Sequence, residues 1–305
     1  MTSRYLKPQA LRKALEDRLK TYSRESGLPL DRLRKEAAFQ RLLARIAAVA
    51  PTGSWALKGG QAMIARSGNH ARATADADAT WRAATVQLQA TLAAAAALNL
   101  DDHFQFLIAP PTSMRGEGPD GAVRFGVQAR LAGRLFEPLR LDINLAPDDP
   151  RPIEQLSLRN FFDFLELPTV VVPAISPGQQ LAEKLHAYTR DYGLHENTRA
   201  KDLYDMLLIA ADLTIPTLGD LVDACATTFA LRETPWPPQR LNPPPLTWIG
   251  PWAGFVRDYG TRFLTLDSAY QALTAFWRPA LSFTEPADSS WDSTTWTWSS
   301  SGHVG

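Results

Sequence analysis

The chain has 305 residues, of which 45% are hydrophobic and 21% are charged, and its formal net charge at pH 7 is zero. This composition is typical of a soluble globular protein with one large domain or two ordinary ones. The single cysteine, Cys225, excludes an internal disulfide framework and gives no indication of a cysteine-based zinc site.

The sequence carries no sign of a membrane segment or a secretion signal. Its longest apolar run, 92–98, is mostly alanine and falls far short of the roughly 20 residues that a membrane span requires. The N-terminus is charged from Arg4 and Lys7 onward and has no apolar signal-peptide core. We therefore expect a cytoplasmic protein that does not bind membranes.

The zero net charge hides a basic N-terminal segment. Residues 1–46 hold twelve Lys and Arg against five acidic residues, which gives this segment a charge of +7. Such a segment can bind nucleic acid through its phosphates. The alternative is a set of solvated helical faces, which the even spread of the charges favours.

In chain order, the pattern begins with helices. Leucines recur every four residues in 8–19, which predicts a helix, and an apolar stripe predicts a second helix over 32–49. Further helices are expected at 61–66, 83–98, 177–190, 198–211, 218–231, 252–263 and 266–277. Strands are expected at 55–57, 103–108, 123–131, 135–145 and 169–172, with a hairpin turn at Ala132-Gly133.

These elements divide the chain into four expected parts. Basic helices occupy 1–50, a mixed α/β core 51–175, a helical domain 176–285 and a flexible tail 286–305. The tail is rich in Ser, Thr and Trp without a period that would form a packed core, so we expect it to be mobile, with tryptophans that could dock on the body or on a partner.

A glycine turn follows the first predicted strand. Lys58, Gly59 and Gly60 stand between that strand and a short helix. Glycines ahead of a helix N-terminus allow backbone N–H groups to approach a phosphate closely. The plain alternative for Lys58 is a surface lysine at the end of a strand.

The next segment alternates without exception. Its polar residues Arg72, Thr74, Asp76 and Asp78 share one parity, and alanines occupy the other. In a strand both carboxylates would lie on one face, where they repel each other unless a cation lies between them. A divalent metal is the usual answer, and a glycine turn beside paired aspartates is what metal-dependent phosphoryl or nucleotidyl transfer requires.

Three later segments add candidate residues. Asp142 belongs to a predicted strand and could complete a two-metal site with Asp76 and Asp78; otherwise it is an exposed strand aspartate. Lys184 lies within an amphipathic helix and suits a triphosphate, although a lone helical lysine is normally solvated. Asp202 and Asp205 lie on one helical turn, where the helix dipole alone would favour acidic residues.

Taken together, four motifs resemble the AbiEii/MenT group of nucleotidyltransferases, which are toxins of bacterial toxin–antitoxin and phage-defence systems. The motifs are Lys58-Gly-Gly60 with Thr74-x-Asp76-x-Asp78, Leu141-Asp142-Ile143, Ala182-Glu-Lys184-Leu-His-Ala187 and Arg199-x-Lys201-Asp202-Leu-Tyr204-Asp205. They occur in the family's order and cover about 50–215. The family usually has bulky apolar residues around its two aspartates, where this chain has alanines.

The resemblance implies a polymerase-β-like nucleotidyltransferase core with a mixed sheet, followed by a C-terminal helical bundle. It also implies an NTP donor and Mg²⁺ held by Asp76 and Asp78. By position, Lys184 matches the family's helical lysine, and Asp202 and Asp205 match its last acidic motif. Some members add nucleotides to the 3′ end of tRNA and block translation, and an AbiEi-like antitoxin encoded nearby acts mainly on transcription.

The expected mechanism assigns a role to each candidate. Asp76, Asp78 and Asp142 bind metal, while Lys58, Gly59, Gly60 and Thr74 bind the nucleotide, with Lys184 neutralising charge as pyrophosphate leaves. Asp202 or Asp205 orients the lysine or acts as a base. Two alternatives stay open: a nucleotidyltransferase that modifies a small molecule or a protein, and a non-catalytic binding module.

Overall fold

A computed structural model describes residues 7–114, 121–147, 149–238 and 240–300. The chain divides into two compact units, Met1–Asn69 with Ala73–Ile175, and His70–Arg72 with Ser176–Gly305. The short segment His70–Arg72 therefore groups with the second unit although it lies within the sequence of the first.

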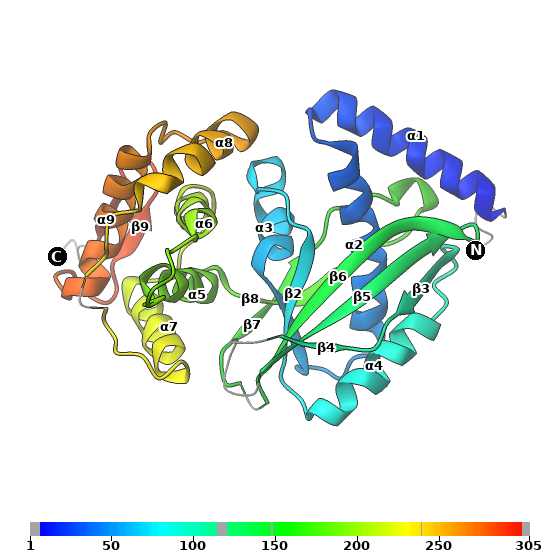
Figure 1. The fold of residues 1–305 in the computed structure, drawn as a ribbon, viewed down its shortest axis with the longest axis horizontal. Helices are drawn as coiled ribbons and strands as arrows, with labels where there is room; N and C mark the ends of the chain where they lie inside the picture. The colour runs from blue at the N-terminus through cyan, green and yellow to red at the C-terminus, as the bar shows by residue number, and fades with distance from the viewer. Residues whose placement is uncertain (1–6, 115–120, 148, 239, 301–305) are drawn as a thin grey trace, which may run out of the picture. The chain divides into compact units, whose positions relative to one another are not determined.

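Unit 1 is a mixed sheet with helices (Figure 1). Its strands are β1 (Trp55–Lys58), β2 (Asp76–Trp81), β3 (Phe104–Ile108), β4 (Thr112–Met114), β5 (Ala122–Leu131), β6 (Arg134–Leu145), β7 (Ile153–Ser157) and β8 (Val171–Ile175). Its helices are α1 (Pro8–Ser26), α2 (Leu30–Val49), α3 (Gly59–Ser67) and α4 (Thr85–Ala97), and the short 3₁₀ turns η1 (Gly68–His70) and η2 (Asp163–Leu165) follow α3 and β7.

The strand order is β3-β5-β6-β2-β1-β8-β7, and β4 pairs with β5. Strand β2 runs parallel to β6 and β1 parallel to β8, whereas β1–β2, β5–β6, β3–β5 and β7–β8 are antiparallel. The predicted mixed sheet and the hairpin at Ala132-Gly133 are both confirmed. Strands β4 and β7 were not predicted, because both are short and lie in segments with Pro-rich surroundings.

The predicted N-terminal helices exist, but they are not a separate segment. Helix α1 begins at Pro8 and ends where Gly27 adopts φ +73°, a conformation that glycine takes without strain. Leucines 11, 15 and 19 lie in the same hydrophobic core as the sheet. Helix α2 contacts β6, β8 and α4, and α1 contacts β5.

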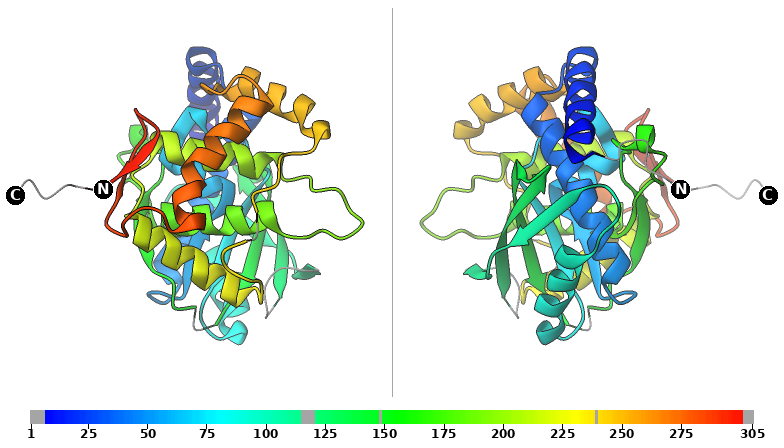
Figure 2. Two further views of the ribbon diagram at one scale, coloured as in Figure 1. Left: turned by 90° about the vertical axis from the view of Figure 1, so that its left-hand side faces the viewer. Right: turned by 90° about the vertical axis from the view of Figure 1, so that its right-hand side faces the viewer.

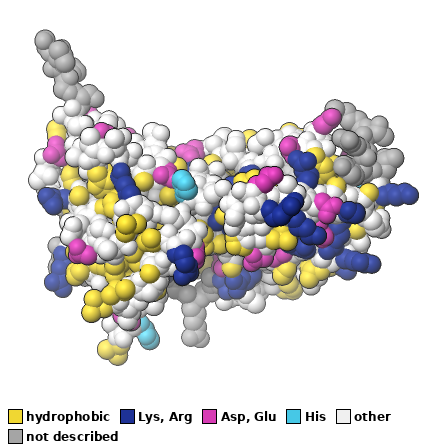
Figure 3. Space-filling model, turned by 90° about the horizontal axis from the view of Figure 1, so that it is seen from above, with side chains coloured by type: hydrophobic (Ala, Val, Ile, Leu, Met, Phe, Trp, Pro, Cys, Tyr) yellow, Lys and Arg dark blue, Asp and Glu magenta, His cyan; other side chains and the backbone are white. Residues whose placement is uncertain are grey.

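Many of the basic residues in this segment take part in internal ion pairs. Arg45 and Arg41 bind the buried carboxylate of Asp102, and Arg32 pairs with Glu36 inside the unit. On the face that carries α1, Lys and Arg side chains are interspersed with Asp and Glu (Figure 3). The basic charge is therefore partly structural, and it supports an RNA partner less than the residue count implies.

Unit 2 is mainly helical, which confirms the predicted C-terminal helical bundle. Its elements are α5 (Pro177–Thr189), α6 (Ala200–Asp212), α7 (Leu218–Leu231), η3 (Leu246–Trp248), α8 (Ile249–Tyr259), α9 (Leu266–Ser282), β9 (Ser290–Asp292) and β10 (Thr297–Ser299). Helix α6 contacts α5, α8 and α9, and α7 packs on α5 and α9. Among the described helices of the chain, none combines the length and the apolar character that a membrane crossing requires.

The expectation of a mobile tail is wrong for residues 290–299. Strands β9 and β10 form a hairpin that lies against α9 (Figure 2). The indole N–H groups of Trp291, Trp296 and Trp298 donate to the backbone oxygens of Ala210, Ala272 and Phe276. Large aromatic side chains with satisfied N–H groups offset the cost of ordering a polar segment. Residues 301–305 lie outside the described part of the chain.

Candidate active site

The glycine turn follows β1 directly. Gly59 has φ +63°, and a Cβ built there would overlap the carboxylate of Asp78. A Cβ on Gly60 would lie 2.6 Å from the Cβ of Thr74. Both glycines therefore allow the start of α3 to lie against Asp78 of β2 and against Thr74, which precedes that strand. Without them this close approach would be blocked by steric overlap.

Four charged residues form one row across four neighbouring strands. In the register of the sheet, Arg124 of β5 pairs with Asp142 of β6, Asp142 with Asp78 of β2, and Asp78 with Lys58 of β1. Residues paired in this way project to the same face of a sheet. Two adjacent carboxylates are thus flanked by two cations. We call these residues the charged row.

Alanines and aliphatic residues line the opposite face of the same strands. Ala77 and Ala79 of β2 and Leu141 and Ile143 of β6 are buried in the core of unit 1. The alternation read from the sequence therefore separates a packed face from a charged face. The core cluster that holds these alanines also includes larger residues such as Phe39 of α2.

Two arginines hold the carboxylates of this face. The guanidinium of Arg124 binds both oxygens of Asp142, at 2.7 and 2.6 Å, and Arg140 Nε lies 2.5 Å from Asp76 Oδ1. The hydrogen bond to Asp142 and the charges of Asp142, Asp76 and Asp78 raise the pKa of Arg124 far above its usual range. The guanidinium is therefore attracted by three carboxylates.

The residue types on this face fit a divalent cation, although their present arrangement does not form a cage. Three carboxylates from two adjacent strands are the oxygen ligands that Mg²⁺ prefers. Within the described ranges, however, no three His, Cys, Asp or Glu side chains converge closely enough to hold a metal ion. Asp142 and Asp76 are instead paired with Arg124 and Arg140.

Thr74 has a local role in this geometry. Its hydroxyl donates to the backbone oxygen of Asp76 at 3.1 Å. This contact shapes the chain where it enters β2, next to the position that Gly60 leaves open. The expected nucleotide contact of Thr74 stays a prediction.

The remaining predicted residues lie in unit 2, where they form a second charged cluster. Lys184 Nζ on α5 lies 2.6 Å from Asp205 Oδ2 and 3.3 Å from Asp202 Oδ1 on α6. Arg72 binds both oxygens of Asp205 at 3.0 and 2.9 Å. The side chain of Asp205 is 1% exposed and that of Lys184 is 8% exposed. We call these four residues the buried ion cluster.

The cluster favours the charged forms of Lys184 and Asp205. Burial alone would lower the pKa of Lys184, but the charges of Asp205 and Asp202 outweigh it and raise the pKa above its ordinary value. Burial alone would raise the pKa of Asp205, but Lys184 and Arg72 outweigh it and lower the pKa. Lys184 is therefore a buried, ion-paired residue and not the solvated lysine that is usual on a helix.

Arg72 was not among the predicted site residues. The sequence carried one signal, because Arg72 shares its parity with Thr74, Asp76 and Asp78 in the alternating segment. Its partner Asp205 lies 133 residues further along the chain, and no local pattern identifies such a pair.

His186 lies near Lys184 in sequence but behaves as a structural residue. Its ring packs edge to face against Phe229. Burial, together with the charges of Arg232 and Arg190, lowers the pKa of His186 to about 4. A neutral, buried imidazole of this kind agrees with leaving His186 outside the site.

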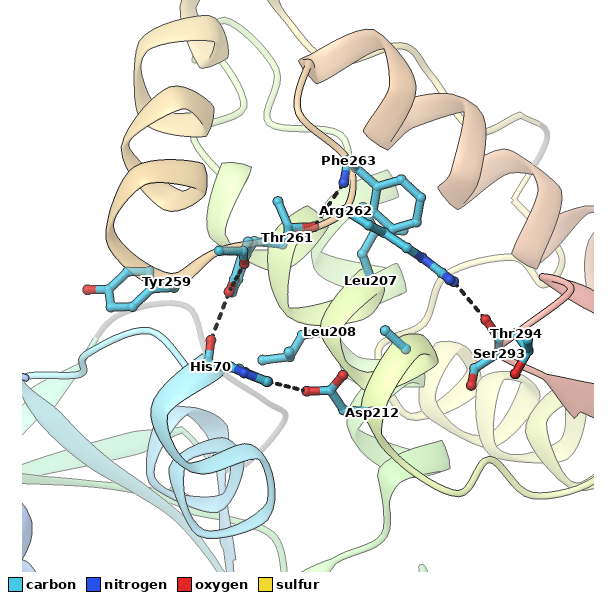
Figure 4. Close-up of a pocket in the computed structure, with 13 residues that line it drawn as sticks. His70, Leu207, Leu208, Asp212, Tyr259, Thr261, Arg262, Phe263, Ser293 and Thr294 are labelled. Carbon is cyan, nitrogen blue, oxygen red and sulfur yellow. Dashed lines mark hydrogen bonds and ion pairs between the residues drawn. The ribbon is translucent and has the colours of Figure 1, made fainter. Parts of the chain in front are cut away.

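Unit 2 also contains a pocket of about 570 Å³ (Figure 4). Leu207 and Leu208 of α6 lie along it, and His70 Nδ1 is 3.0 Å from Asp212 Oδ2 at one side. Opposite them, Arg262 donates to the backbone oxygen of Ser293. None of the predicted site residues lines this pocket.

Comparisons with known proteins bear on the family and the fold of this chain. The family model "Nucleotidyl transferase AbiEii toxin, Type IV TA system" matches residues 41–278. The nucleotidyltransferase toxin MenT4 from Mycobacterium tuberculosis H37Rv is similar in structure, with a TM-score of 0.50 and 19% identity over 84% of this chain and 77% of that chain. A putative nucleotidyltransferase from H. pylori gives a TM-score of 0.39 and 15% identity, over 81% and 97% of the two chains. No curated protein matches the sequence.

The family match covers well over half of the chain, including the glycine turn, the charged row and the buried ion cluster. The similarity to MenT4 is one of fold. The chain belongs to the AbiEii family of nucleotidyl transferase toxins from type IV toxin–antitoxin systems, and it is a nucleotidyltransferase.

Proposed function

We propose that this nucleotidyltransferase transfers a nucleoside monophosphate from an NTP to the 3′ end of tRNA, in a reaction that depends on Mg²⁺ and blocks translation. The observation that carries the proposal is the charged row, in which the adjacent carboxylates of Asp78 and Asp142 lie beside the glycine turn. This arrangement combines carboxylate ligands for a cation with backbone N–H groups for a phosphate.

Asp76, Asp78 and Asp142 would hold the cation. When bound there, Mg²⁺ would neutralise charge on the donor's phosphates and position them for in-line attack. The chain's own residues would seat the donor: Gly59 and Gly60 through their backbone, and Lys58 through its charge.

The reaction forms one bond and breaks one. The 3′-hydroxyl oxygen of the acceptor attacks the α-phosphorus, the bond from that phosphorus to the bridging oxygen breaks, and pyrophosphate leaves. Lys184 would stabilise the charge of the leaving pyrophosphate. The hydroxyl proton passes to a carboxylate or to water.

The contacts of Asp205 support an orienting role more than a role as base. This carboxylate is shared by Lys184 and Arg72, and its lowered pKa makes it a weak proton acceptor. Asp202 makes the longer contact to Lys184, at 3.3 Å, and one of its oxygens is buried without a hydrogen bond among the described residues. That oxygen, Oδ2, also lies 3.8 Å from Arg199 Nη1, so Asp202 contacts two cations.

A type IV toxin–antitoxin family implies an antitoxin, and we propose an AbiEi-like partner that acts mainly on transcription of the gene pair, within a phage-defence role in the cytoplasm. A small molecule or a protein is the alternative acceptor, because the same nucleotidyl-transfer chemistry applies to any attacking hydroxyl. A non-catalytic binding module is the second alternative. Family membership and the retention of every expected carboxylate count against it.

The test is a transfer assay with each α-labelled NTP in turn, Mg²⁺ and total tRNA, beside an Asp78→Ala control. Label in tRNA that depends on Asp78 supports the proposal. Label in protein or in a small acceptor, with none in tRNA, favours the alternative acceptor class. Absence of both label and NTP binding would leave only the binding module.

A further inference from the structure

Arg124 and Arg140 have no role in the reaction described above, yet both lie on the charged face. They come from adjacent antiparallel strands, and each binds a carboxylate that the proposed function needs for a cation. Their side chains are 37% and 50% exposed, so the long stems can change rotamer without disturbing the core.

The ion pairs of Arg124 with Asp142 and of Arg140 with Asp76 compete with a bound cation for the same carboxylate oxygens. A carboxylate oxygen that accepts a short bond from a guanidinium has less capacity to coordinate a divalent ion. A guanidinium carries a single charge, whereas the cation carries two and sits closer to the oxygens. Binding of a cation would therefore release both guanidinium groups while leaving them next to the site.

A released guanidinium is free of its carboxylate and can bind another anion that has two oxygens at similar spacing. Phosphate presents such oxygens, and arginine binds carboxylate and phosphate with the same planar fork. A phosphate chain brought in with the cation would be such an anion.

We propose that Arg124 and Arg140 form an exchangeable phosphate subsite: they hold Asp142 and Asp76 when no cation is bound, and they bind phosphate oxygens when a cation takes those carboxylates. The proposal rests on the proposed function, because it assumes that the three carboxylates bind a divalent cation. It adds two phosphate ligands from β5 and β6 to the glycine turn on the other side of β2.

The proposal predicts effects of opposite sign on two ligands. Removing the charge of Arg124 removes a competitor for the carboxylates, so the bare cation should bind more tightly. The same change removes a phosphate ligand, so a phosphate chain should bind more weakly. A residue that merely orients Asp142 would weaken both.

The experiment uses the full chain with Arg124→Gln and Arg140→Gln, and with Arg134→Gln on β6 as the matched control, since Arg134 lies at an exposed position on the same strand as Arg140. Electron paramagnetic resonance measures binding of Mn²⁺ alone. Calorimetry then measures binding of inorganic tripolyphosphate in saturating Mn²⁺, and fluorescence anisotropy measures binding of total tRNA under the same conditions.

We expect each variant to bind Mn²⁺ about fivefold more tightly and one phosphate probe about tenfold more weakly, as the loss of one partly screened charge implies. The control should match the wild type. Weaker binding of tripolyphosphate identifies the donor as the source of the phosphate, and weaker binding of tRNA alone identifies the acceptor.

Two results would overturn the inference: weaker Mn²⁺ binding in both variants, or unchanged binding of both phosphate probes. Because Arg140 is the more exposed of the two, its variant decides the matter if Arg124→Gln does not fold. If the wild type itself binds neither Mn²⁺ nor tripolyphosphate, the proposed function fails and this inference fails with it.

Discussion

Gly59 combines a left-handed backbone conformation with close contact to the carboxylate of Asp78. Gly59→Ala would strain a left-handed residue by about 1–2 kcal/mol and push the carboxylate of Asp78 out of place. We expect transfer activity to fall at least about tenfold, because the displaced atom belongs to the charged row.

A matched control separates the two effects. Gly53 has φ +75° and nothing within 4 Å of its Cβ position, so Gly53→Ala should cost similar stability and leave activity intact. Denaturant unfolding and the transfer assay measure both quantities. Equal loss of activity in the two variants would contradict the account.

The charge of Asp205 makes the stability of the fold depend on pH. Its pKa is lowered in the folded state from the ordinary value of 3.8, so its contribution to stability is present above that pH and is lost as the pH falls through the folded value. Lys184 has a pKa raised above 10.5, so its contribution is present below that pH and is lost as the pH rises through the folded value.

Asp205→Asn should therefore lower the free energy of unfolding by about 3–5 kcal/mol, because it leaves a buried lysine with one partner fewer. The difference from the wild type should be constant between about pH 5 and pH 9 and shrink in acid, in urea titrations at each pH. A difference that grows as the pH falls below 4 would show that Asp205 does not carry the charge inferred here.

Among the elements of unit 1, α2 is connected to β3 through the carboxylate of Asp102, which precedes that strand. Its carboxylate accepts hydrogen bonds from Arg41 and Arg45 of α2 and from the backbone N–H of Phe104, the first residue of β3. Burial alone would raise the pKa of Asp102, but the hydrogen bond from Arg45 and the charges of Arg41 and Arg45 lower it.

Asp102→Asn should thus lower the free energy of unfolding by about 3 kcal/mol or more, since two buried guanidinium groups lose their anion. Asp101→Asn, at the exposed neighbouring position, should change it by less than about 0.5 kcal/mol. Chemical denaturation of both variants tests the difference. Similar values for the two would mean that the buried ion pair contributes no more than a surface charge.

The elements differ in how far the sequence could predict them. The alternation of β2 and the hairpin at Ala132-Gly133 were predictable, because periodicity and turn residues are local signals. The pairing of Arg124 with Asp142 depends on strand register, which the sequence does not specify. The terminal hairpin was missed because its tryptophans are stabilised by packing on α9, not by any period of their own.

At the scale of the whole chain, the site residues belong to two units. The glycine turn and the charged row lie in unit 1, and the buried ion cluster lies in unit 2. The order of the family's motifs along the chain indicates that these residues belong to one site, which their spacing alone does not indicate. The basic N-terminal charge was the least informative signal, because Arg32, Arg41 and Arg45 serve the interior of unit 1.

The most direct test of the central claim compares α-labelled with γ-labelled NTP in the transfer assay, for the wild type and for Asp78→Asn. Nucleotidyl transfer leaves the α-label in the acceptor and releases the γ-label with pyrophosphate. We predict acceptor labelled only by the α-label in the wild type, and a loss of at least about a hundredfold in Asp78→Asn. Label from the γ-position in the acceptor would contradict nucleotidyl transfer. Undiminished α-label in the variant would contradict the assignment of the charged row as the catalytic centre.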